Sequence, residues 1–380
     1  MKFNPKTHTK EFFLRHPDYL EEIIKTDPDF LDEPLASDFE LLKKKVNKNF
    51  DETAAHVFAL HQNNWVHSDS AKNYDVLKLQ NKYKRSVAHV LASKHPEWVS
   101  SDAARDYEIL LLKTDNNWTV ALNLAEMCPA WVHSEAAQDY SILTHTSRGQ
   151  KYTVAHALAH SQKEWMKSKA SHDFKILTLK DNAGESVALN LIEHTECLQH
   201  EPLFDKRILS LKANGKTLAE DLIQKHCSQE LMPQVAMKLI SKGIAYKQQN
   251  FISTGVGQAI YDQTLELIDA CTDDNVSFKY LAALYSTFSH YASNFQNNDD
   301  KENIDYFESL LNRASGLIKD QIDAQPHLLN SEKKFDLFCE PAQHLLVQLM
   351  NERIFRHSLD NSQHQEHEPQ SPEVDEIKLY

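Results

Sequence analysis

Thr153-Val-Ala-His-Ala-Leu-Ala belongs to a phrase that recurs along this chain and decides its fold. Each copy opens with Thr or Ser and continues with two small or apolar residues. The copies lie 33, 33, 34, 33 and 31 residues apart, opening at Thr53, Ser86, Thr119, Thr153, Ser186 and Thr217. A period of this size indicates a stacked array of structural repeats.

Two further landmarks keep the same register. Twelve residues after each opening comes a tryptophan, replaced by leucine in the fifth copy: Trp65, Trp98, Trp131, Trp165 and Leu198. An aromatic-x-Ile-Leu phrase follows, with small variations, at Tyr74, Tyr107, Tyr140, Phe174 and Lys206. Three landmarks in one register over five copies make a chance repeat untenable.

Each repeat predicts a pair of helices. The Thr or Ser is suited to cap the first helix, because its hydroxyl can accept a bond from an unpaired backbone N–H. Val87, Ala88, Leu91 and Ala92 then have the spacing of one helix face. A second helix is expected after the Trp, ending near Leu77, Leu110, Leu143, Leu177 and Leu209. One such pair cannot bury its apolar face alone, so we expect an all-α solenoid.

The turns between repeats carry a family resemblance. Asp181-Asn-Ala-Gly-Glu-Ser and Asn214-Gly-Lys-Thr resemble the Asp-x-x-Gly-x-Thr opening of ankyrin repeats. The whole phrase, Thr-Val-Ala-His-x-Leu-Ala…Trp…Asp-Tyr-x-Ile-Leu, is similar to divergent ankyrin-like repeats of bacterial proteins. The resemblance implies stacked helix pairs and recognition of another protein.

The remaining sequence divides the chain into four parts. Residues 1–52 are expected to form a helical N-terminal cap with a degenerate half-repeat, and 53–228 about five ankyrin-like repeats. Residues 229–356 predict a non-repetitive helical domain, and 357–380 a disordered acidic tail. The candidate helices of the third part are Leu231–Lys247, Gly255–Ala270, Phe278–Phe295, Ile304–Ile322 and Phe335–Phe355.

Composition limits the compartment and the partners. The 380 residues carry a net charge of −14 and no evident basic stripe, so we expect no nucleic-acid partner. The five scattered cysteines suggest reduced thiols and a cytoplasmic location. No apolar run follows Met1-Lys-Phe-Asn-Pro-Lys and none is long enough for a bilayer, so we expect neither a signal peptide nor a membrane span.

The tail allows two interpretations. Glu366-His-Glu-Pro-Gln-Ser-Pro-Glu-Val-Asp-Glu, followed by Ile377-Lys-Leu-Tyr, is similar to C-terminal export signals of type IV-secreted effectors of intracellular bacteria. That resemblance implies a virulence effector that reaches the host-cell cytosol without a signal peptide. An ordinary solvated acidic tail explains the same residues.

Three sets of repeated residues invite a chemical role, and each also has a structural explanation. His56, His89 and His156 share one register that Leu122, Leu189 and Glu220 fill elsewhere, which favours packing or a hydrogen bond at the helix start over a metal. The aspartates before the second-helix phrase are best explained as caps: Asp38, Asp106, Asp139, Asp173 and Asp205, with Asn73 in the remaining place. The four tryptophans are expected to be core wedges rather than a stacking platform.

The leading functional hypothesis is protein–protein recognition. No catalytic or cofactor motif appears, and no cofactor or metal is expected. The candidate partner-binding residues are those of the turns that lead into each first helix: Tyr83, Lys84, Arg85, Asn117, Trp118, Lys151, Tyr152, Glu185 and Lys216. The partner would be a host protein or a fellow effector. Two alternatives stay open: an enzyme with an unrecognised site in the C-terminal helices, and a regulator that masks another protein's active surface. The oligomeric state is also open.

Overall fold

A computed structural model describes residues 2–147, 151–226, 228, 231–247, 253–297, 301–326, 328, 341–349 and 351. Over these residues the chain is all-α apart from short two-stranded ladders. It forms two compact units, Met1–Lys225 (unit 1) and His226–Tyr380 (unit 2).

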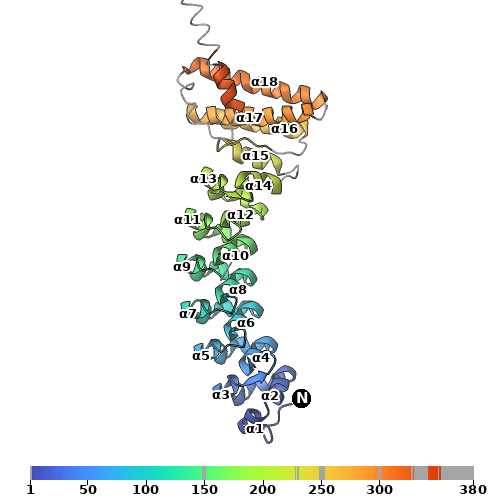
Figure 1. The fold of residues 1–380 in the computed structure, drawn as a ribbon, viewed down its shortest axis with the longest axis vertical. Coiled ribbons are helices and arrows are strands. Elements are labelled where there is room, and N and C mark those ends of the chain that lie inside the picture. The colour runs from blue at the N-terminus through green and yellow to red at the C-terminus, as the bar shows by residue number, and fades with distance from the viewer. Residues whose placement is uncertain are drawn as a thin grey trace, which may run out of the picture. The chain divides into compact units, whose positions relative to one another are not determined.

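The phrase of the repeat builds the longer helices of unit 1. They begin one residue after the Thr or Ser: α4 (Ala54–His61), α6 (Val87–Lys94), α8 (Val120–Met127), α10 (Val154–Ser161), α12 (Val187–Leu191) and α14 (Leu218–Lys225). Each packs against the next in the series, and they follow one another in a row in Figure 1. The small alanines allow this close approach, and Ala88 and Ala121 have no exposed surface.

The second half of each repeat is broken where a single helix was expected. The Trp lies in a 3₁₀ helix: η3 (Asn63–His67), η5 (Pro96–Ser100), η7 (Pro129–His133), η9 (Lys163–Lys167) and η11 (Thr195–Gln199). A second short 3₁₀ turn follows: η4 (Ser70–Lys72), η6 (Asp102–Ala104), η8 (Ala136–Gln138), η10 (Ala170–His172) and η12 (Glu201–Phe204). One turn of α-helix then closes the repeat: α5 (Tyr74–Leu77), α7 (Tyr107–Leu110), α9 (Tyr140–Leu143), α11 (Phe174–Leu177) and α13 (Lys206–Leu209).

The residues that were expected to cap the second helix also explain the break. The Asp106 carboxylate accepts hydrogen bonds from the N–H groups of Glu108 and Ile109. Asp139, Asp173 and Asp205 accept the equivalent bond two residues on. Such local side-chain bonds compete with the helical backbone, so a continuous helix gives way to separate turns.

The four repeated tryptophans are core residues. Trp65, Trp131 and Trp165 are 0% exposed and Trp98 is 1% exposed. The Trp131 indole N–H donates to the Ala104 carbonyl at 3.4 Å. Burial excludes these rings from stacking on a ligand at the surface.

The N-terminal segment is more complete than a half-repeat. It comprises α1 (Lys10–Arg15), α2 (Pro17–Thr26), η1 (Pro28–Asp32), η2 (Pro34–Ser37) and α3 (Phe39–Leu42). Helix α2 packs against α4, as α4 packs against α6. Phe30 takes the place of the Trp and stacks on Phe58 with ring centroids 6.0 Å apart. The segment is therefore a divergent whole repeat preceded by α1.

Antiparallel pairs close the repeats into hairpins. β1 (Lys45–Asn47) pairs with β2 (Glu52–Thr53), and β3 (Lys212–Ala213) with β4 (Lys216–Thr217). Single bridges hold the others, joining Gln80 to Ser86, Lys113 to Thr119, Thr146 to Thr153 and Lys180 to Ser186. The hairpins present the turn residues that the sequence singled out.

Unit 2 has longer, non-repetitive helices: α15 (Met232–Ile240), α16 (Thr254–Asp269), α17 (Asp274–Asn297) and α18 (Lys301–Ala324), with a further helix over 341–349. The expected helix Leu231–Lys247 ends early, because Gly243 takes a left-handed backbone (φ 72°) and the chain turns there. The expected helix Phe335–Phe355 lies partly, and the tail 357–380 wholly, outside the described residues.

Candidate partner-binding surface

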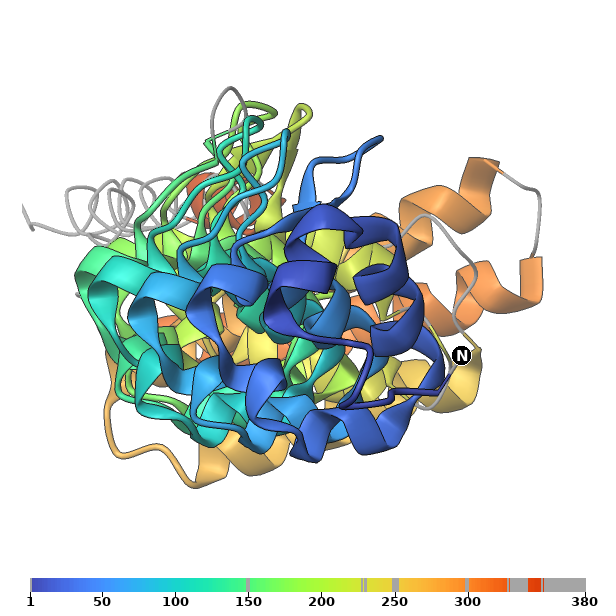
Figure 2. The same ribbon diagram turned by 90° about the horizontal axis from the view of Figure 1, so that it is seen from below.

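The nine candidate residues lie in the hairpin loops, defined here as residues 45–52, 80–85, 113–118, 146–147 with 151–152, 180–185 and 212–216. Figure 2 shows these loops projecting together from one side of the helices of unit 1. Tyr83, Lys84, Lys151 and Lys216 are exposed. Arg85, Asn117, Trp118, Tyr152 and Glu185 are partly buried.

The loops share one backbone geometry. The residue two places before each helix cap has a positive φ, between 49° and 56° at Asp51, Lys84, Asn117 and Lys151. Glycine fills this place at Gly184 (81°) and Gly215 (83°). A left-handed residue is needed there for the hairpin to turn, and glycine adopts that conformation at no steric cost.

Side chains within the loops fix this geometry. The Asn81 Oδ1 atom accepts bonds from the N–H groups of Tyr83 and Arg85, at 3.0 and 3.1 Å. Asp181 accepts the equivalent bond from Glu185 N–H at 2.9 Å. A loop held in this way loses little conformational freedom when a partner binds.

Neighbouring loops are also tied to one another. Lys82 N–H donates to the Phe50 carbonyl at 3.1 Å, and Asp115 N–H to the Tyr83 carbonyl at 2.9 Å. The Lys84 ammonium lies 3.3 Å from the Asp115 carboxylate. The first three loops therefore form a continuous backbone-bonded surface.

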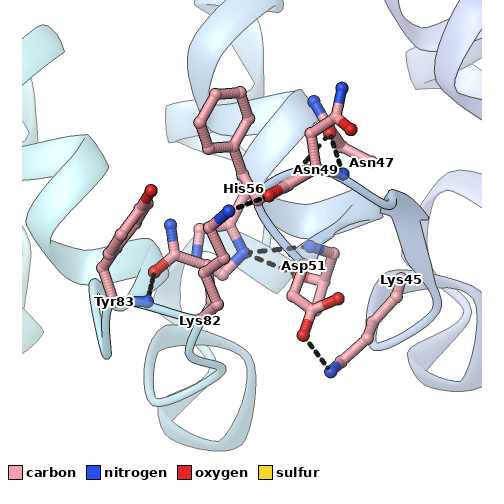
Figure 3. A network of polar contacts seen from close by, with 10 residues as sticks. Lys45, Asn47, Asn49, Asp51, His56, Lys82 and Tyr83 are labelled. Carbon is pink, nitrogen blue, oxygen red and sulfur yellow. Dashed lines mark hydrogen bonds and ion pairs between the residues drawn. The ribbon is translucent and has the colours of Figure 1, made fainter.

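The first two loops carry a cluster that sequence reasoning missed. The Lys82 ammonium lies 5.1 Å from the ring centroid of Phe50 and 5.0 Å from that of Tyr83. Figure 3 shows Lys82 reaching from its own hairpin to Asn49 of the preceding one. Both rings keep about half of their surface in solvent, 45% and 50%. The cluster joins two repeats, so only the repeat period could have pointed to it.

Two of the nine candidates serve packing. The Trp118 indole N–H donates to Asn123 Oδ1 at 2.7 Å, and its ring stacks on Tyr152 with centroids 6.4 Å apart. Burial raises the pKa of the Tyr152 phenol to about 12. These two residues hold the third and fourth loops together.

Positive charge gathers in the hairpin loops. The described loop residues contain ten Lys or Arg and five Asp or Glu, whereas the whole chain has a net charge of −14. This local excess is not evident in the linear sequence, because six separate segments contribute to it.

The recurring histidines link one repeat to the next. His56, His89 and His156 are 0% exposed, and each Nδ1 accepts from the N–H of the helix-capping Thr or Ser. Each Nε2 donates to a carbonyl of the following hairpin, at 2.9 Å to Arg85, 3.0 Å to Trp118 and 3.2 Å to Glu185. The rings are therefore neutral, and burial lowers the pKa of His56 and of His89 to about 4. This is the hydrogen-bonding role expected at the helix start.

A second set of links was not foreseen. The side chain that follows each of α4, α6, α8 and α10 bonds to a carbonyl of the preceding helix in the series, as His95 Nε2 does to Ala59 at 2.8 Å. Cys128 Sγ bonds to Ala92 at 3.5 Å and Gln162 Nε2 to Ala125 at 3.1 Å. Three residue types share one role here, so no sequence pattern reveals it.

The buried cluster of unit 2 is apolar and includes Phe278, Leu281, Ile318 and Leu346. Over the described part of both units, no group of three or more His, Cys, Asp or Glu could hold a metal ion. Likewise, no described helix is long and apolar enough to cross a membrane.

The chain was compared with known families and proteins. No family model matches it, and no curated protein matches it.

Proposed function

We propose that this protein is a protein-interaction scaffold, an α-solenoid of divergent ankyrin-like repeats that binds its partner through the hairpin loops of unit 1. The observation that carries the proposal is a surface of six preorganised loops with an excess of basic side chains. Such a surface favours an acidic face on the partner protein, since complementary charge speeds encounter and excludes wrong partners.

The cluster of Phe50, Lys82 and Tyr83 is the expected centre of binding energy. Aromatic and cationic side chains dominate the energetics of protein interfaces. The rings of Phe50 and Tyr83 are exposed. Their position is fixed because the Lys82 N–H donates to the Phe50 carbonyl and so joins the first hairpin loop to the second.

Affinity purification with mass spectrometry from host and source-cell lysates identifies the partner. A variant with Lys82→Ser, Tyr83→Ser and Lys84→Ser is then compared with the wild type. The matched control carries Lys72→Ser and Lys94→Ser, two exposed lysines outside the loops. The proposal requires the loop variant alone to lose the partner; equal capture by all three proteins would contradict it.

The effector role is part of the same proposal and rests on the resemblance of the tail to type IV export signals. Removal of residues 357–380 should block translocation into host cells and leave the melting temperature of the protein unchanged. Translocation of the truncated chain at the wild-type level would refute the effector role alone.

A further inference from the structure

A second exposed feature of unit 1 is a row of aromatic rings, one per repeat, here called the aromatic ladder: Phe39, Tyr74, Tyr107, Tyr140 and Phe174. Each opens the short helix that closes its repeat, α3, α5, α7, α9 or α11. The rings are 37–51% exposed, although the two aliphatic residues that end each of these short helices are buried. In the sequence these residues are landmarks of the repeat period.

One phenol group of the ladder is bonded to the next repeat. Tyr107 OH donates to Asp139 Oδ1 at 3.5 Å. Burial and the nearby Asp106 carboxylate of the next repeat raise the pKa of the Tyr74 phenol. Tyr107 is thus oriented from its hydroxyl end while its ring stays partly exposed.

Two rings of the ladder are covered by cationic side chains of the chain itself. The Arg207 guanidinium lies over the Phe174 ring at 4.2 Å from its centroid and pairs with Asp205 at 2.8 Å. At the other end of the ladder, the Lys43 ammonium lies 5.6 Å from the Phe39 centroid. Among the described residues, no cation covers Tyr74, Tyr107 or Tyr140.

Acidic residues predominate near the three uncovered rings in sequence, and one of them, Glu108, is paired with Lys78 at 2.7 Å. Residues 69–75, 102–108 and 135–141 together contain seven Asp or Glu and two Lys or Arg. The equivalent residues around Phe174, 169–175, contain one acidic residue and two lysines. The net charge of the residues near the ring is therefore negative at the three uncovered tyrosines and positive at Phe174, the ring that Arg207 covers.

A groove of about 650 Å³ lies between the repeats that contain Tyr140 and Phe174. Glu135 and Asp139, close in sequence to Tyr140, line it together with Glu164, Lys167 and Lys169. Glu164 pairs with Lys167 at 2.7 Å. The carboxylates of Glu135 and Asp139 are therefore the acidic groups in this groove that a cationic side chain of a partner can meet.

We propose that Tyr74, Tyr107 and Tyr140 form a docking site for an extended, arginine-containing segment of a partner protein. Each guanidinium lies on one ring by a cation–π contact and pairs with the neighbouring carboxylates. Packed helices lie about 8–10 Å apart. An extended chain in the polyproline II conformation has three residues per turn and advances about 3.1 Å per residue, so arginines at every third residue lie on one side of it, about 9 Å apart, and match the ladder. The site uses none of the hairpin-loop residues and stands independently of the function proposed above.

The probe is a fluorescent peptide, Arg-Gly-Ser-Arg-Gly-Ser-Arg, and the assay is fluorescence anisotropy with the full chain. Two control peptides replace arginine by lysine, which keeps the charge, or by citrulline, which removes it. The arginine peptide should bind more tightly than the lysine peptide, and the citrulline peptide should not bind. Equal binding of all three, or no binding of the arginine peptide, would overturn the proposal.

Three variants of the protein locate the site. Tyr74→Leu, Tyr107→Leu and Tyr140→Leu together should weaken binding of the arginine peptide about tenfold, since the rings are lost. The triple Phe variant keeps the rings and should bind within about twofold of the wild type. Tyr19→Leu, an exposed aromatic on α2, should change nothing. Melting temperatures verify that each variant is folded; unchanged affinity in a folded triple Leu variant would refute the site.

Discussion

The two units of this chain reach an all-α fold by different routes. In unit 1 the α-helices have ten residues or fewer, and each is stabilised by the same contacts to the repeat before and after it. In unit 2 the helices α16 to α18 have 16 to 24 residues and meet around one core. Unit 2 links residues as distant in sequence as Ser286 and Ala342, whose N–H donates to the serine hydroxyl at 3.3 Å. Unit 1 is therefore stabilised by contacts between neighbouring repeats all along its length, and unit 2 by one core that its long helices share.

The largest expected effect is the loss of a repeated wedge. Trp98→Ala should lower the free energy of unfolding by about 3–5 kcal/mol, because it empties a fully buried site in the stack. The matched control is Trp118→Ala, whose ring is only partly buried in a hairpin loop. Urea denaturation measures both; an equal cost for the two would mean that the Trp register is not the core of unit 1.

Acid should weaken unit 1 through its buried histidines. Their folded pKa lies below the unfolded value, so their stabilising effect is complete above about pH 6.5 and is lost as the pH falls toward 4. Each unit of pKa shift is worth about 1.4 kcal/mol per histidine. His89→Leu, the residue found at Leu122 and Leu189, should flatten this dependence.

Melting temperatures measured from pH 7.5 to 4.5 test that prediction. The exposed His133 serves as the control, and His133→Leu should leave the profile as it is. A profile equally steep in the wild type and in His89→Leu would show that other groups govern the acid response.

A smaller effect is expected in unit 2 at a close helix contact. A Cβ at Gly257 would lie 2.8 Å from Phe307 Cε1, so Gly257→Ala should cost about 1–3 kcal/mol. Gly316, in α18, has nothing within 4 Å of an added Cβ, and Gly316→Ala should gain about 0.5–1 kcal/mol from helix propensity. Thermal unfolding should show a lower melting temperature for Gly257→Ala and a higher one for Gly316→Ala. A lower melting temperature in both variants would contradict the packing of α16 on α18.

The smallest effect concerns the hairpin turns. Gly184→Ala should destabilise unit 1 by about 1 kcal/mol, because φ is 81° there and L-residues resist that backbone although space is open. Lys84→Gly should have the opposite sign or none, since Lys84 already bears that strain at φ 56°. Chemical denaturation measures the free energy of unfolding of both variants. A higher value for Gly184→Ala than for the wild type would contradict the shared turn geometry.

Structural features that depend on one residue type recurring at one register could be predicted from the sequence, and features that several residue types produce could not. The helix starts at Ser86 and Thr153 were evident because one capping residue recurs at one register. The link from His95 to Ala59 was missed because Gln, His and Cys alternate at that place. The break before α7 was missed because the Asp106 cap outweighs the helical pattern around it.

The candidate surface could be located only in part. The turns were identified from their position before each helix, but the cluster of Phe50, Lys82 and Tyr83 depends on two loops being adjacent in space. The exposure of Tyr107 could not be predicted either, because the Ile and Leu of the same phrase are buried. In unit 2, the positions of α16, α17 and α18 were predicted, and the expected first helix was too long because Gly243 turns the chain after α15. The packing of these helices on one another had no signal in the sequence.

If the repeats of unit 1 are equivalent neighbours, the chain should tolerate the removal of one whole repeat but not of half a repeat. Deleting residues 120–153 joins Thr119 to Val154 and keeps the register, whereas deleting residues 120–136 joins Thr119 to Ala137 and destroys it. Circular dichroism followed through thermal unfolding should show a cooperative, helical protein for the first deletion and an unfolded or aggregated unit 1 for the second. Loss of cooperative folding in both proteins would mean that the repeats are not equivalent neighbours.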